Sequence, residues 1–155
     1  KLQAAFGLRR AESIKIQPAW ADRGDRLALR PSWCKGGRSR EIPIRTDVQR
    51  HLLDEAKAFA GRGSLIPRES RYVDQLRRFE HQCRQASIHR VHGHRHAYAQ
   101  QRYRDLTGWN APAAGGPSLK SLTPEQKALD QEARLTISQE LGHEREAVTA
   151  VYLGR

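Results

Sequence analysis

The spacing of the apolar residues changes once along the chain, and this change constrains the fold more than any other feature. Early in the chain, apolar side chains recur at every second position in three segments, residues 13–20, 26–32 and 40–45. Such alternation is typical of half-buried strands. Gly36 and Gly37 fall between the second and third segments and suit a tight hairpin turn. The pattern predicts a small three-stranded antiparallel sheet near the N-terminus.

Helical spacing dominates the rest of the chain. Apolar side chains recur every third or fourth residue in two stripes, namely Val48, Leu52, Ala56 and Phe59, followed by Tyr72, Leu76, Phe79 and Cys83. Further helices are predicted at residues 92–106, 123–141 and 144–153, and the end of another at residues 2–13. The TPEQ sequence that opens the 123–141 segment is a capping box with proline at the first helical position. The expected fold class is therefore α+β, a mainly helical domain with a small sheet.

The charge of the chain is strongly positive and unevenly placed. Its 155 residues include 28 basic and 17 acidic side chains, a formal net charge of +11. Residues 1–104 carry a net +13 and residues 105–155 a net −2. A basic surface of this kind suits a polyanion, and nucleic acid is the expected partner. An anionic membrane surface is the alternative, but no basic helix has the wide apolar face that it needs, and no apolar stretch is long enough to span a bilayer.

The cysteines and histidines offer one possible metal site. Cys34 and Cys83 are far apart in sequence and are interpreted as reduced cytosolic thiols. His92, His94 and His96 alternate and could bind zinc from one face of a strand. The residues after them are helical in character, and ligands two apart on a helix diverge. We therefore expect no metal and no cofactor. On a helix His92, Arg95 and His96 share a face that suits a phosphodiester, or is simply a solvated polar face.

Five local patterns, in order along the chain, together resemble the catalytic domain of the tyrosine recombinase, or phage integrase, family. They are GLRRAE at residues 7–12, KGGRSREIPI at 35–44, HGHRH at 92–96, LGH at 141–143, and Tyr152. Each pattern alone is weak, but their order and spacing over nearly the whole chain make the resemblance specific. The third pattern departs from the family's H-x-L-R-H in having His94 in place of leucine.

The resemblance implies strand exchange through a DNA-3′-phosphotyrosyl intermediate. The catalytic residues it implies are Arg9, Lys35, His92, Arg95, His143 and Tyr152. The two arginines would clamp the non-bridging phosphate oxygens, and His143 would donate to the same phosphate. Tyr152 would be the nucleophile, His92 would assist proton transfer, and Lys35 would protonate the 5′-oxygen that leaves.

The resemblance also implies partners and domain boundaries. We expect double-stranded DNA carrying attachment sites as the substrate, assembly into a tetramer on that DNA, no membrane, and a cytoplasmic, nucleoid-associated location in a bacterium. Residues 1–155 would be a catalytic domain without the family's N-terminal DNA-clamping domain and C-terminal tail, a fragment, as the absence of methionine also suggests. The glycine- and proline-bearing residues 107–122 form a predicted loop, inserted where the family has a short link.

Two other functions remain open from the sequence. A type IB topoisomerase uses the same chemistry on one duplex, and only the resemblance of the motifs distinguishes an integrase from it. A catalytically inactive DNA-binding module is the non-enzyme alternative. The presence of Arg9, Lys35, Arg95, His143 and Tyr152 argues against the inactive module.

Overall fold

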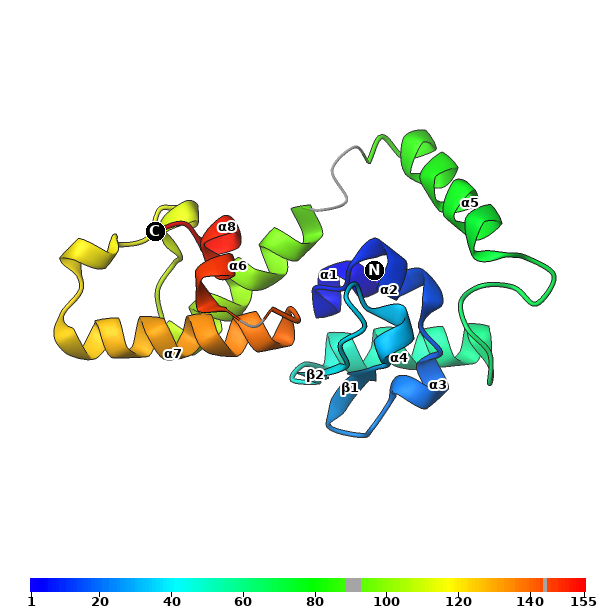
Figure 1. Ribbon diagram of the computed structural model, residues 1–155, viewed down its shortest axis with the longest axis horizontal. Helices are drawn as coiled ribbons and strands as arrows, with labels where there is room; N and C mark the ends of the chain where they lie inside the picture. Colours follow the sequence, from blue (N-terminus) through cyan, green and yellow to red (C-terminus); the bar gives the residue numbers. More distant parts are fainter. Residues whose placement is uncertain (89–92, 144) are drawn as a thin grey trace.

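The structure is a computed structural model that describes residues 1–88, 93–143 and 145–155, and it is mainly helical with one two-stranded sheet (Figure 1). The α-helices are α1 (Leu2–Phe6), α2 (Arg10–Lys15), α3 (Pro18–Ala21), α4 (Asp47–Ala60), α5 (Tyr72–Gln85), α6 (Gly93–Thr107), α7 (Pro124–Glu140) and α8 (Ala150–Leu153). The strands are β1 (Arg26–Leu29) and β2 (Arg40–Pro43), and short 3₁₀ turns are η1 (Pro31–Trp33), η2 (Pro112–Ala114), η3 (Leu119–Ser121) and η4 (Glu146–Thr149). The expected α+β class is confirmed.

The prediction of a third strand at residues 13–20 is wrong, because this segment forms α2 and α3. Ile14 and Ile16 are both buried although they are two positions apart. They can be so because α2 ends between them, and the chain turns before Pro18 opens α3 at a favoured helical position. A break between two short helices thus mimics the alternation of a strand.

The other two strands are confirmed and pair antiparallel, with Leu27 opposite Ile42 and Leu29 opposite Arg40. Leu27, Leu29 and Ile42 are buried, as their alternation predicts. The connection between the strands is wider than a tight hairpin turn, because η1 lies within it. Gly36 and Gly37 both adopt positive φ, at 80° and 67°, and turn the chain back toward β2.

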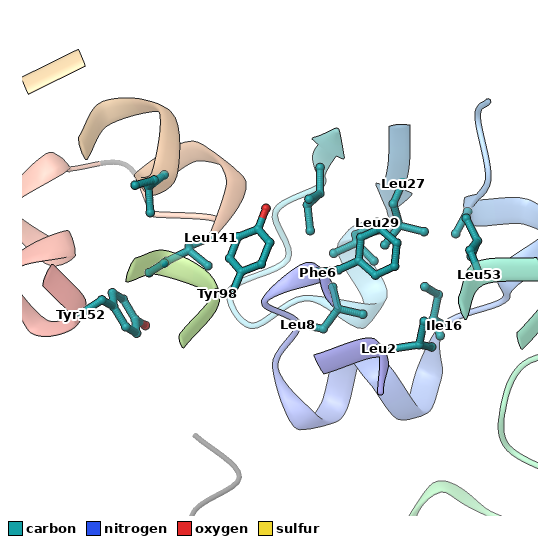
Figure 2. Close-up of a cluster of buried hydrophobic side chains, with 14 of the residues drawn as sticks. Leu2, Phe6, Leu8, Ile16, Leu27, Leu29, Leu53, Tyr98, Leu141 and Tyr152 are labelled. Carbon is teal, nitrogen blue, oxygen red and sulfur yellow. The ribbon is translucent and has the colours of Figure 1, made fainter. Parts of the chain in front are cut away.

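One hydrophobic core joins the two halves of the molecule. The first half contains α1 to α4 and the sheet, and the second contains α6, α7 and α8 (Figure 1). Contacts of α1 with α6, and of β2 with α7, link them. Figure 2 shows Tyr98 and Leu141 between Tyr152 on one side and Phe6 and Leu8 on the other. The core therefore extends to the tyrosine at the end of the chain, which is 8% exposed.

The buried face of α4 differs from the predicted stripe. Val48 and Phe59 are 67% and 79% exposed, whereas Leu53 is fully buried. The helix is turned because Gln49 is buried and donates from Nε2 to the carbonyl oxygen of Ala5, at 2.8 Å. Periodicity identified the helix and placed Ala56 and the half-buried Leu52 on its inner face correctly. It was wrong for Val48 and Phe59, because it gave no weight to a buried glutamine.

The remaining predicted helices are present in part: the 144–153 segment forms η4 and then α8, and residues 92 and 144 lie outside the described residues. The stripe of α5 is only half-buried, and this helix stands off the body against α2 (Figure 1). In the capping box of α7, the Thr123 hydroxyl accepts from the backbone N–H of Gln126. Residues 108–122 contain only 3₁₀ turns and irregular chain, as expected of a loop. Among the described residues, no helix is long and apolar enough to cross a membrane.

Candidate active site

Arg9 is positioned by the junction between α1 and α2. Gly7 ends α1 with φ of 60°, and a Cβ atom there would lie 2.6 Å from Cδ1 of Tyr98. Only glycine fits this turn without displacing the tyrosine. Arg9 then caps α2, and both its backbone N–H and its side chain donate to the Glu12 carboxylate, at 2.6 and 3.0 Å. The carboxylate thereby fixes the guanidinium at the start of the helix.

Glu12 is in turn held by Arg40 of β2. Nη1 and Nη2 of Arg40 donate to the two carboxylate oxygens at 2.8 and 2.7 Å, and Glu12 is fully buried. Burial alone would raise the pKa of this carboxyl, but the bonds from Arg40 and Arg9 lower it to about 2. Arg40 also donates from Nε to the carbonyl oxygen of Glu140, at 2.9 Å. One arginine thus joins the Arg9 turn to the end of α7.

His143 follows a glycine-dependent helix end. The N–H of His143 donates to the carbonyl of Ser138, and the N–H of Gly142 to that of Gln139, at 2.8 and 2.9 Å. This is the bond pattern of a Schellman motif, with Gly142 at φ of 69°. A Cβ on Gly142 would meet the Arg40 side chain at 2.9 Å. The turn sets the direction in which the His143 ring leaves α7.

Arg95 lies at the centre of the site and is 2% exposed. It donates to the carbonyl oxygens of Gly7, at 2.6 Å, and of Leu141. Nε lies 3.1 Å from the Tyr152 hydroxyl, and Nη2 lies 3.2 Å from Nε2 of His143. The guanidinium therefore contacts the Gly7 turn before Arg9, the Leu141 carbonyl just before His143, and the Tyr152 hydroxyl.

Tyr152 is held in α8 with its hydroxyl among these groups. The hydroxyl oxygen is 3.4 Å from Nε2 of His143, and the phenol ring packs edge-on against His96, with ring centres 4.8 Å apart. Gln100 of α6 donates to the backbone carbonyl of Tyr152, at 3.1 Å. The nucleophile predicted from sequence, one arginine and one histidine thus converge, although they lie far apart in the sequence.

The environment of His143 favours its neutral form. Burial, together with the positive charges of Arg95, Arg9 and Arg40, lowers the pKa of His143 to about 4. Because a guanidinium only donates, Nε2 of His143 is the acceptor toward Arg95, and the ring proton belongs on Nδ1. At neutral pH the ring therefore presents an unprotonated nitrogen to the Tyr152 hydroxyl.

Comparison with known proteins identifies the family. A family model described as integrase matches residues 1–101. The chain belongs to the integrase family. No curated protein and no solved structure matches it. Family membership assigns this chain a role in DNA integration or recombination, and DNA as its partner.

The family match covers only part of the candidate site. It includes Arg9, Lys35 and Arg95, whereas His143 and Tyr152 lie beyond it. The roles of these residues therefore stay predictions for this integrase-family chain. The boundaries of the catalytic domain, and the interpretation of residues 107–122 as an insertion, also stay predictions.

Two predicted site residues, Lys35 and His92, stay untested by the geometry at Tyr152. Lys35 is exposed on the turn between the strands of this integrase-family chain. Its neighbour Cys34 contacts Arg40, with Sγ 3.5 Å from Nη1, so the turn begins beside the Glu12 and Arg40 pair. Within the described ranges no hydrogen bond or ion pair of the Lys35 side chain is found. His92 lies outside the described residues.

Sequence reasoning assigned no role to Glu12 or Arg40, and it placed His96 on a face with Arg95 without predicting its contact with Tyr152; all three belong to the site. The signal for Glu12 is its place three residues after Arg9 at a helix start, where a capping carboxylate is common. His96 shares a helix face with Arg95, which was recognised, but its contact with Tyr152 depends on the fold. Nothing local marks Arg40, because its three partners come from elsewhere in the chain.

The histidine-rich segment has no metal-binding geometry within residues 1–88, 93–143 and 145–155. No group of three or more histidine, cysteine or acidic side chains in those ranges could hold a metal ion. His94 is exposed, whereas His96 packs against Tyr152. Helical geometry directs these two rings apart, as expected for residues two positions apart.

Proposed function

We propose that this integrase-family chain cleaves and rejoins duplex DNA through a covalent bond between Tyr152 and a 3′-phosphate. The observation that carries the proposal is the convergence of Arg95 Nε and His143 Nε2 on the Tyr152 hydroxyl, at 3.1 and 3.4 Å. A phenol needs a proton acceptor and a cationic anchor for the phosphate that it attacks. Both lie beside it.

The other tyrosines with a buried hydroxyl are poorer nucleophiles. Tyr98 donates its hydroxyl to Glu140, at 2.8 Å, and burial together with that carboxylate raises its pKa well above the usual range. Burial and a hydrogen bond to Asp130 raise the pKa of Tyr103 to about 12. A phenol that donates to a carboxylate keeps its proton, so these side chains are structural. This supports Tyr152 as the reacting residue.

In the proposed step, the phenolic oxygen forms a bond to phosphorus and the bond from phosphorus to the 5′-oxygen breaks. When the phosphate accepts the Nη2–H that Arg95 otherwise donates to His143, the lone pair of Nε2 is free to take the phenolic proton. The resulting imidazolium then donates a hydrogen bond to the phosphate oxygen on which charge has developed. Arg9 and Arg95 clamp the two non-bridging oxygens, and Lys35 gives its proton to the leaving 5′-oxygen. His92 stays a candidate for assisting proton transfer. The phosphodiester energy is kept in the tyrosyl ester, so rejoining needs no nucleotide.

Arg95 is also held in position by the backbone before it meets a phosphate. Its guanidinium already bonds the carbonyls of Gly7 and Leu141, so its position is set by the backbone before DNA arrives. A preorganised cation needs little rearrangement when charge develops on the phosphate.

Recombination between two duplexes exchanges four strands, so we expect four copies to assemble on DNA. That assembly stays a prediction.

The test is cleavage of a nicked attachment-site duplex by the full-length protein, scored as covalent protein–DNA product on a denaturing gel. The wild-type protein should give adducts, and Tyr152→Phe should bind the duplex equally well and give none. Tyr72→Phe is the matched control, because this tyrosine lies on α5, away from the site. Adduct formation by Tyr152→Phe, or none by the wild-type protein, would reject the proposal.

A further inference from the structure

A second set of arginines is grouped around Trp20 of α3. The guanidinium carbons of Arg23 and Arg30 lie 4.4 and 4.0 Å from the centre of the Trp20 ring system. Arg30 also lies 5.4 Å from the centre of Trp33, which packs edge-on against Trp20. Stacking on an aromatic face holds a guanidinium in place while its N–H groups point outward from the plane edge. The pair is thus ordered before any ligand binds.

Within the described part of the chain, these two arginines differ from their neighbours in having no acidic partner. Arg26 pairs with Asp25 and Glu41, and Arg50 pairs with Asp22. Among the described residues, neither Arg23 nor Arg30 forms an ion pair or a side-chain hydrogen bond. Since the nearby carboxylates are engaged, the charges of this stacked pair are uncompensated.

The stacked pair lines a groove whose lining also includes Arg40, a residue that supports the candidate active site. The groove has a volume of about 830 Å3, and its lining includes Trp20, Arg23, Arg30, Ser39 and Arg40. Arg40 is the residue that holds Glu12, and through it Arg9. The groove is thus connected to the Arg9 turn through Arg40 and Glu12, and its acidic lining residue, Glu41, is paired with Arg26.

We propose that Arg23 and Arg30, ordered by Trp20, bind backbone phosphates of duplex DNA beside the cleaved position. The planar fork of each guanidinium matches two phosphate oxygens, and neither fork is occupied. This site makes no contact with the reacting atoms and serves to fix the register of the duplex. The inference rests on the proposed function, since it takes the same DNA as its ligand.

The test measures the salt dependence of DNA binding by fluorescence anisotropy. All variants are made in the Tyr152→Phe protein, so that no cleavage occurs, and a labelled duplex is titrated from about 50 to about 300 mM salt. Arg23→Gln and Arg30→Gln should each reduce the slope of log affinity against log salt by about 0.9, and the double variant by about 1.8. Arg26→Gln is the matched control, because it removes the same charge nearby and should leave the slope unchanged.

A variant of the stacking residue separates ordering from charge. Trp20→Leu removes no charge and should weaken binding several-fold by loosening both forks, whereas Trp20→Phe should recover part of the affinity. Thermal melting confirms that each variant is folded. Unchanged slopes for Arg23→Gln and Arg30→Gln would overturn the proposal, as would an equal loss for Arg26→Gln. If Trp20→Leu weakens DNA binding while Arg23→Gln and Arg30→Gln leave it unchanged, Trp20 stacks on a DNA base, and the proposal is overturned.

The outcome is distinguishable from failure of the proposed function. Covalent adduct formation by the protein with Tyr152 intact tests the chemistry, and the salt slopes are measured where no chemistry occurs. Altered slopes without adducts would keep the phosphate site and reject the tyrosine mechanism. Adducts with unaltered slopes would keep the tyrosine mechanism and reject the phosphate site.

Discussion

The guanidinium of Arg40 grips both carboxylate oxygens of Glu12, at 2.8 and 2.7 Å, with the two side chains 5% and 0% exposed. The pair connects β2 to Arg9, the first residue of the proposed phosphate clamp, because Glu12 also binds Arg9. The interaction between Arg40 and Glu12 is strong because it is bidentate and buried. Removing one partner would leave the other charge in a buried site, which costs stability.

The first prediction concerns the stability of this pair. Arg40→Gln removes the bidentate partner of a fully buried carboxylate, which then keeps only Arg9, and should lower the free energy of unfolding by about 3 kcal/mol. Arg26→Gln, which breaks only exposed pairs, should cost far less than Arg40→Gln. Urea unfolding measures both. Equal costs for the two variants would show that the Glu12 and Arg40 pair adds nothing beyond a surface contact.

The second prediction concerns the pH dependence of stability. An unfolded histidine titrates near pH 6.5, whereas His143 in the folded chain has a pKa of about 4. Between these values the unfolded chain binds more protons, so the free energy of unfolding should fall as the pH falls from 6.5 to 4. The lowered pKa of Glu12, about 2 against 4.5, should extend the loss below pH 4.5. Urea unfolding of His143→Gln should show a flatter profile above pH 4.5, and an unchanged profile would contradict this account.

The third prediction concerns the arginine clamp. Arg9→Lys and Arg95→Lys replace a planar fork by a point charge and should each raise the cleavage barrier by about 2–4 kcal/mol. DNA affinity should change far less, because many other basic residues meet the backbone. Arg10→Lys is the control, since Arg10 pairs with Glu80 on the surface. Single-turnover cleavage and anisotropy measure the two effects. Cleavage near the wild-type rate in both clamp variants would remove these arginines from the mechanism.

The fourth prediction concerns Lys35, which the structure leaves exposed on a turn beside Cys34 and Arg40. If Lys35 is the acid for the leaving group, Lys35→Ala should be slow on normal DNA and near the wild-type rate on DNA with a 5′-bridging sulfur, because a thiolate leaves without a proton. His92→Ala is the parallel control. Equal impairment of Lys35→Ala on both substrates, relieved by more protein, would make this lysine a backbone contact only.

The sequence predicted those parts of the site that local rules control. The capped start of α7 depends on neighbours within a few residues, and the structure has it. The prediction of a third strand is wrong because Ile14 and Ile16 lie on either side of a helix end, which alternation in the sequence does not distinguish from a strand. The predicted inner face of α4 is partly wrong because the hydrogen bond from Gln49 to the Ala5 carbonyl joins α4 to α1, a long-range contact that periodicity does not show.

Long-range contacts were beyond sequence reasoning for the same reason. Arg40 meets Glu12 and the Glu140 carbonyl only when β2, α2 and α7 are packed together. The spacing of His143 and Tyr152 suggested a common site, but their approach to Arg95 depends on how α6 packs against α7 and α8. Motif order identified the family, and tertiary packing determined the geometry.

The central claim is that Tyr152, held by Arg95 and His143, forms the covalent bond to DNA. The most direct measurement traps the reaction on a duplex with a 5′-bridging sulfur, in EDTA, and identifies the DNA-linked peptide by mass spectrometry. The account predicts one adduct, at Tyr152, carrying a 3′-phosphate linkage, formed without added metal. A linkage at Tyr98 or Tyr103, a 5′-phosphate linkage, or an adduct that forms only with metal would contradict it.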